Sequence, residues 1–185
     1  MSAKFHIKST VLALGAVLLT STAFAAMKMV GGAPMYPTKN IVENAVNSKD
    51  HTTLVAAVKA AGLVDTLSTP GPFTVFAPTN EAFKKLPKGT VETLVKPENK
   101  ATLTSILTYH VVAGKLTAAD LADMVKQGGG EATLKTVEGD SLTVTKKGRN
   151  LMVTDAKGDV SRITIPDVMQ SNGVIHVVNT VLLPK

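Results

Sequence analysis

The histidines are the residues best suited to acid–base chemistry or metal binding in this chain, and three of them follow the N-terminal segment: His51, His110 and His176. None has a partner at the helical spacing of a His-Glu-x-x-His zinc site. His110 and His176 each stand within an apolar run typical of a buried strand. Such a histidine is usually neutral and hydrogen-bonded to a carbonyl or hydroxyl group. We therefore interpret both as structural, and a metal bridging two neighbouring strands stays open as the alternative.

Nucleophilic catalysis has little support in the sequence. The chain has no cysteine and no Gly-x-Ser-x-Gly turn. Asp167, Ser171 and His176 are close in sequence, but a histidine facing inward from a strand is poorly placed to reach a serine in a turn. The glycines form neither a phosphate-binding loop nor a dinucleotide fingerprint. We predict that the protein is not an enzyme and has no cofactor.

Three methionines near the N-terminus suggest a different chemistry. Met27, Met29 and Met35 carry thioethers, which suit Cu(I), so an exported copper-handling protein is the alternative function. No histidine or cysteine joins them, however, and two glycines and two prolines lie between residues 31 and 37. This composition favours a flexible leader over residues 26–39.

The first 25 residues are typical of a signal peptide of the short bacterial kind. Lys4 and Lys8 precede an apolar core at residues 11–19, and Ala23-Phe24-Ala25 forms a cleavage site. Removing 25 of the 185 residues leaves 160, enough for one domain. We predict a secreted or periplasmic protein without a transmembrane segment after cleavage. Loss of the two lysines lowers the formal charge from +6 to +4, and the remaining charges are scattered, so we expect no nucleic-acid partner.

The order of elements predicts an α+β fold. Helical patterns dominate up to residue 127, and Asn40, Thr79 and Thr117 stand where helix N-caps are expected. Alternating β patterns dominate from residue 131. The last strand, residues 174–178, is apolar on both faces, which predicts a central position in the sheet. Phe76 and Phe83 are expected to anchor one strand–helix unit.

Two segments resemble the signatures of fasciclin-like domains. Residues 73–83, Phe-Thr-Val-Phe-Ala-Pro-Thr-Asn-Glu-Ala-Phe, are similar to the first signature, and residues 172–184 are similar to the second. Tyr109-His110 stands between them at the Tyr-His position of the family. The resemblance covers residues 40–185 and implies a wedge of two small β-sheets with several helices packed alongside. The motif residues that it marks as structural are Phe73, Phe76, Pro78, Thr79, Phe83, Gly173, His176 and Asn179.

The resemblance also nominates interaction residues. Pro166-Asp167-Val168-Met169 is similar to a Pro-Asp-Ile-Met segment proposed to contact integrins in animal members, although Ile165 stands where those members have Glu. Tyr109 and His110 are nominated with it. A structural interpretation is also open, because Pro166 can end a strand and Asp167 can cap the next turn.

These observations predict an exported, non-catalytic binding module. The family implies cell-surface or matrix adhesion, here through loops on a rigid core. The expected partner is a cell-surface glycan or protein, and the chain is expected to be a monomer.

Overall fold

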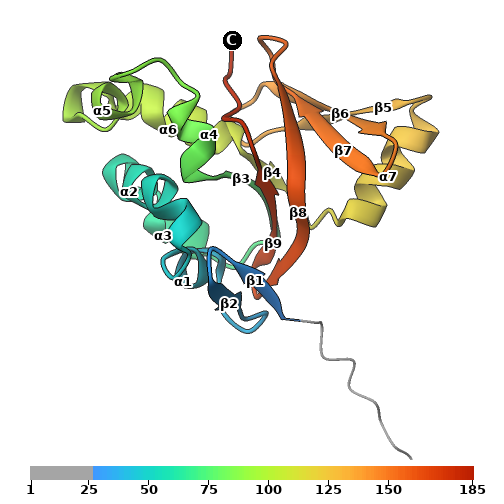
Figure 1. The fold of residues 1–185 in the computed structure, drawn as a ribbon, viewed down its shortest axis with the longest axis horizontal. Helices are drawn as coiled ribbons and strands as arrows, with labels where there is room; N and C mark the ends of the chain where they lie inside the picture. Colours follow the sequence, from blue (N-terminus) through green and yellow to red (C-terminus); the bar gives the residue numbers. More distant parts are fainter. Residues whose placement is uncertain (1–26) are drawn as a thin grey trace, which may run out of the picture.

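The computed structural model describes residues 27–185, so the predicted signal peptide at residues 1–25 lies outside the described residues. A seven-stranded sheet has the order β4-β3-β9-β8-β7-β6-β5 and carries helices on both faces (Figure 1). Strands β3 (Phe73–Pro78) and β9 (Gly173–Val178) are parallel, and the other neighbouring pairs are antiparallel. The other strands are β4 (Val111–Ala113), β5 (Glu131–Lys135), β6 (Ser141–Lys147), β7 (Asn150–Thr154) and β8 (Val160–Gln170).

The C-terminal strand β9 is central, as its sequence predicts. It pairs with β3 on one side and β8 on the other, and all six of its residues are buried. A strand covered on both faces needs apolar side chains at successive positions, and the Val-Ile content of β9 supplies them.

Strand β8 bends the sheet into two halves. Residues 160–162 pair with β7, and residues 163–170 pair with β9 through two shifts in register. Asp167 lies in the second shift and has φ of +55°, a left-handed conformation. The halves β4-β3-β9-β8 and β8-β7-β6-β5 therefore share one long strand. The predicted α+β wedge is confirmed.

Helices cover the two faces unequally. One face packs against α1 (Ile41–Ala45), α2 (Thr52–Ala61), α3 (Val64–Ser68), α4 (Asn80–Lys84), α5 (Thr90–Leu94) and α6 (Lys100–Tyr109), with the short 3-10 helices η1 (Lys49–His51) and η2 (Pro97–Asn99) between them. The other face packs against α7 (Ala118–Gln127). No helix within residues 27–185 has the length and apolar character needed to cross a membrane.

The two phenylalanines of the first signature belong to different cores. Phe83 packs with the α1–α6 helices, whereas Phe76 packs with α7 on the opposite face. The sequence predicted that they anchor one unit, but successive strand residues point to opposite faces. Val75 and Ala77 are the strand residues that share a core with Phe83.

Three helix starts follow the predicted capping chemistry. Asn40 and Thr117 form complete capping boxes with Glu43 and Asp120, and the Thr79 hydroxyl accepts a hydrogen bond from the Ala82 amide. Local sequence is sufficient for these features because each capping contact spans three residues.

The segment predicted to be a flexible leader is instead a β-hairpin in the structure. Strands β1 (Lys28–Val30) and β2 (Ala33–Met35) pair across Gly31-Gly32, both of which have positive φ. Val30 and Met35 are buried in the same core as the α1–α6 helices. The glycines that suggested flexibility form the tight turn, and the apolar residues beside them pack on the domain.

Candidate functional site

His176 is held in the interior at the bulge of β8. Its Nε2 atom lies 2.8 Å from the Leu116 carbonyl oxygen, and its Nδ1 atom accepts a hydrogen bond from the Asp167 amide at 3.2 Å. These partners fix the neutral form with the proton on Nε2, because a carbonyl only accepts and an amide only donates. The ring is fully buried and stacks on Phe76 with centroids 5.7 Å apart. Burial lowers the pKa of His176, and the Leu116 carbonyl opposes this only in part.

His110 is also held by one backbone acceptor and one backbone donor, but its proton is on Nδ1. The sequence placed it in a strand, but α6 ends at Tyr109 and His110 is its C-cap. Nδ1 lies 2.8 Å from the Ile106 carbonyl oxygen, and Nε2 accepts a hydrogen bond from the Leu182 amide at 3.0 Å. Burial lowers the pKa of His110 to about 4.

All four ring nitrogens of these two histidines are therefore occupied by backbone groups. The two rings share no partner, since His110 contacts Ile106 and Leu182, and His176 contacts Leu116 and Asp167. A bridging metal would have to displace these contacts. Within residues 27–185, no group of three or more His, Cys, Asp or Glu side chains is arranged to hold a metal ion.

Tyr109 ties α6 to the β-meander. Its hydroxyl donates to the Ser141 carbonyl oxygen at 2.9 Å and accepts from the Ala156 amide at 2.8 Å. Burial raises the pKa of Tyr109 to about 12, so the phenol stays protonated at neutral pH. Tyr109 and His110, nominated as interaction residues, are both buried and have internal partners.

The Pro166–Met169 segment is also occupied internally. Val168 is only 1% exposed and belongs to the core, whereas Pro166, Asp167 and Met169 are half-buried. The Asp167 carboxylate accepts a hydrogen bond from the Ala118 amide at 2.7 Å, in the first turn of α7. The segment thus holds the bulge, His176 and the start of α7 in one unit.

The remaining motif residues position the junction of β3 and β9. A Cβ on Gly173 would lie 2.0 Å from the Phe73 carbonyl oxygen, so only glycine permits this approach. Asn179 accepts a hydrogen bond from the Arg162 amide through its side chain and from the Lys85 ammonium through its carbonyl. Pro78 ends β3, and Thr79 begins α4.

The three methionines do not converge. Met27 and Met29 are 54% and 59% exposed, whereas Met35 is 3% exposed. Met29 pairs with Pro34, and Met35 pairs with Lys28, which places Met29 and Met35 on opposite faces of the hairpin. The copper-handling alternative has no support in this geometry.

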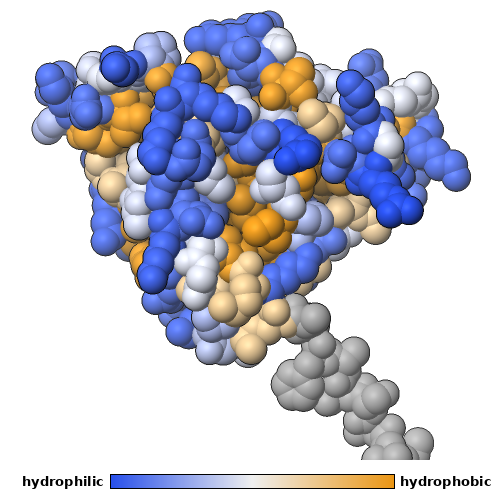
Figure 2. Space-filling model, in the orientation of Figure 1, coloured by the Kyte–Doolittle hydropathy of each residue, from blue (hydrophilic) through white to orange (hydrophobic). Residues whose placement is uncertain are grey.

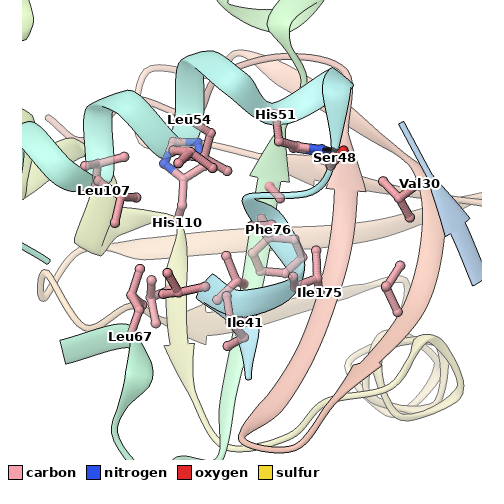
Figure 3. Close-up of a pocket in the computed structure, with 18 of the residues that line it drawn as sticks. Val30, Ile41, Ser48, His51, Leu54, Leu67, Phe76, Leu107, His110 and Ile175 are labelled. Atoms are coloured by element: carbon pink, nitrogen blue, oxygen red, sulfur yellow. Dashed lines mark hydrogen bonds between the residues drawn. The ribbon is translucent and has the colours of Figure 1, made fainter. Parts of the chain in front are cut away.

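The sequence indicated no structural role for His51, which entered only as an optional ligand of the copper-handling alternative. It is 4% exposed, its Nδ1 lies 2.8 Å from Ser48 Oγ, and it lines an apolar cavity with His110 (Figure 3). Its Nε2 is the one buried side-chain nitrogen or oxygen without a hydrogen-bond partner in the described part of the chain. Burial lowers the pKa of His51, and the backbone of Ala77, which lies nearby without completing a hydrogen bond, opposes this only in part. The i, i+3 spacing of Ser48 and His51 is the sequence signal that could have indicated this pair.

The fold and these motif residues, whose polar groups form internal hydrogen bonds, define a class of protein. It is an α+β scaffold in which the polar motif residues hold strands and helices together. The sequence model of the Fasciclin domain matches residues 49–184. The chain belongs to the fasciclin-domain family.

The chain is also similar to individual known proteins. It is 53% identical to protein sll1483 of Synechocystis sp. over 78% of this chain and 73% of the relative. It is 48% identical to the uncharacterized protein sll1735 of the same organism over 78% of this chain and 97% of the relative. A solved pair of FAS1 domains from the insect cell adhesion molecule fasciclin I matches with a TM-score of 0.69 and 20% identity, over 78% of this chain and 51% of that chain. At this identity the structural match shows the fold alone.

Proposed function

We propose that the protein is an exported, non-catalytic binding module that mediates cell-surface or matrix adhesion through exposed turns on a rigid core. One observation carries the proposal: the polar groups of His110, His176 and Tyr109 are consumed by internal hydrogen bonds. The family motifs therefore build the scaffold, and partners are expected to contact the exposed surface. Membership in a family that includes an insect cell adhesion molecule also supports an adhesive function.

The basic residues at the end of β6 and in the turn that leads to β7 are the strongest surface feature for such contact. Lys146, Lys147 and Arg149 are exposed, and none forms an ion pair with another residue in the range 27–185. The basic residues at the C-terminal end of α4 differ, because Lys84 pairs with Glu81 and Lys85 donates to the Asn179 carbonyl oxygen. Three unpaired cations in four positions favour an acidic surface glycan as the partner.

The test is binding of the purified mature chain to immobilised acidic polysaccharides, neutral polysaccharides and matrix proteins across a salt series. We expect binding to an acidic polysaccharide that weakens as salt rises, because exposed charges are screened over about 10 Å at 0.1 M salt. The double variant Lys146→Glu/Lys147→Glu should lose this binding, and the matched variant Lys84→Glu/Lys88→Glu should keep most of it. Binding to no member of the panel contradicts the adhesive function; equal losses in both variants contradict the assignment of the turn.

Export is tested separately. Mass measurement of the protein recovered from the periplasm and the medium should show cleavage after Ala25. An intact N-terminus on a chain retained in the cytoplasm contradicts the exported location.

A further inference from the structure

The half-sheet formed by β5, β6, β7 and β8 has one covered face and one open face. Successive side chains of a strand point to opposite faces of a sheet. Ala132, Leu142 and Val153 lie on the face that packs against α7. The opposite surface, here called the open face, carries the odd-numbered residues of β5 and β6 and the even-numbered residues of β7 and of β8 up to Arg162. None of the side chains on the open face is buried.

Threonine hydroxyl groups form a row across the middle of the open face. The register places Thr133 beside Thr143 and Thr143 beside Thr154, on strands that lie about 4.8 Å apart. Thr145 adds a fourth hydroxyl group two residues further along β6. The hydroxyl of Thr164 donates to a backbone carbonyl group, whereas these four form no hydrogen bond with another described residue. Each can therefore donate to and accept from a ligand.

Positively charged side chains stand around this row. Lys135 ends β5, Lys147 ends β6 and Arg162 is on β8, and all three are exposed. None of them forms an ion pair with another residue of the described chain. Glu131 is the single acidic residue of the open face, so the face carries an excess of positive charge. This excess favours an anionic partner.

The composition of the open face suits a hydroxyl-rich polymer better than a protein. The cores of protein interfaces are enriched in aromatic residues and depleted in Lys and Ser, and the open face has no aromatic residue. Its most central apolar side chain is Met152, which is partly exposed and belongs to neither core. Figure 2 shows a mainly hydrophilic surface over β6 and β7, at the right of the view, whereas apolar residues gather at the centre.

We propose that the open face is the platform on which a linear acidic polysaccharide lies. The sugar hydroxyl groups bond with the threonine row, and carboxylate or sulfate groups of the polymer meet Lys135, Lys147 and Arg162. The inference rests on the acidic glycan proposed above as the partner and extends its site from the β6–β7 turn across four strands. Lys147 belongs to both surfaces, because it ends β6 and pairs with Asn150 beside the turn.

The platform is located by NMR titration of the mature protein with oligosaccharides of polygalacturonate, with dextran sulfate and with uncharged dextran. We expect both acidic probes to shift the methyl signals of Thr133, Thr143 and Thr154, and dextran to leave them unchanged. The methyl signals of Thr52 and Thr66 serve as the control, because both residues are exposed on the helical side. Their signals should not move with any of the probes.

A pair of charge variants tests the cations away from the β6–β7 turn. Lys135→Glu/Arg162→Glu should weaken binding of polygalacturonate by about tenfold and reduce its dependence on salt, because two contacts to the polymer are lost. The control Lys59→Glu/Lys126→Glu changes the net charge by the same amount at exposed positions on α2 and α7. It should weaken binding by less than about threefold, because distant exposed charges are screened.

A second pair of substitutions tests the hydroxyl row. Thr143→Val/Thr154→Val removes two hydroxyl groups and keeps the β-branched shape that suits a strand. We expect binding to weaken by about three- to tenfold, as the loss of hydrogen bonds predicts, with an unchanged dependence on salt.

Different results would contradict the platform and the partner. Methyl shifts absent from the threonine row, with amide shifts confined to the β6–β7 turn, would overturn the platform and leave the acidic glycan as the partner. Equal losses of affinity in the two charge variants would do the same. Binding of neither acidic probe would contradict the partner and the platform together. If a variant fails to fold, the titration of the unmodified protein decides the question.

Discussion

Acidification from pH 7 to pH 5 should destabilise the domain through His110. In the folded protein, the proton on Nδ1 points to the Ile106 carbonyl oxygen, and the lone pair on Nε2 accepts from the Leu182 amide. A second proton would have to enter at Nε2, where it would face another donor. The folded protein therefore resists protonation of His110, whereas the unfolded chain does not.

The magnitude follows from the two pKa values. The pKa of His110 is about 4 in the folded protein, and the ordinary value of about 6.5 applies to the unfolded chain. Because the folded value is the lower one, the unfolded state binds more protons below pH 6.5, and the free energy of unfolding falls as the pH decreases. The full difference is about 3 kcal/mol well below pH 4, and about 2 kcal/mol of it is lost by pH 5. His176 contributes in the same direction, because burial lowers its pKa as well.

The assay is urea denaturation followed by circular dichroism at pH 7, 6 and 5, above the range where most carboxylates titrate. We expect the free energy of unfolding to fall by about 2 kcal/mol or more over this range. The His110→Gln variant is less stable at pH 7 and should show a smaller dependence on pH, because glutamine does not titrate. A stability that changes by less than about 0.5 kcal/mol between pH 7 and 5 would refute the assigned tautomer and burial of His110.

Three further predictions concern stability, each measured by the same denaturation experiment. Phe83→Ala should cost about 3–5 kcal/mol because the ring is 8% exposed in the core, whereas Val160→Ala, at 51% exposed, should change stability by less than about 0.5 kcal/mol; similar effects of the two would contradict the burial of the ring. Gly173→Ala should prevent folding or displace β9 from β3, because the added Cβ meets the backbone of Phe73; a normal melting transition would contradict that close approach. Asp167→Ala should cost about 1–2 kcal/mol through loss of the contact to α7 and the unfavourable left-handed conformation, and Asp167→Asn should cost less; the reverse order would exclude both causes.

The amino-acid sequence by itself determined the features that depend on near neighbours. The capping boxes at Asn40 and Thr117 each involve residues three positions apart, so their residue types are enough to predict them. The burial of β9 follows from apolar residues on both of its faces, and the α+β order follows from the change of periodicity near residue 130. The family signatures add the overall architecture.

Only the tertiary structure decided how the polar groups are used. His110 is 72 residues from Leu182 and His176 is 60 from Leu116, so no local pattern specifies which nitrogen of each ring carries the proton. The segment at residues 28–35 was predicted to be flexible for the same reason. Its glycines are compatible with a flexible chain, and only the packing of Val30 and Met35 in the core shows that it forms a hairpin. The cavity beside His51 is the space left where four helices, a hairpin and a sheet meet. Its shape depends on side chains brought together from across the whole chain, which is why the sequence alone did not reveal it.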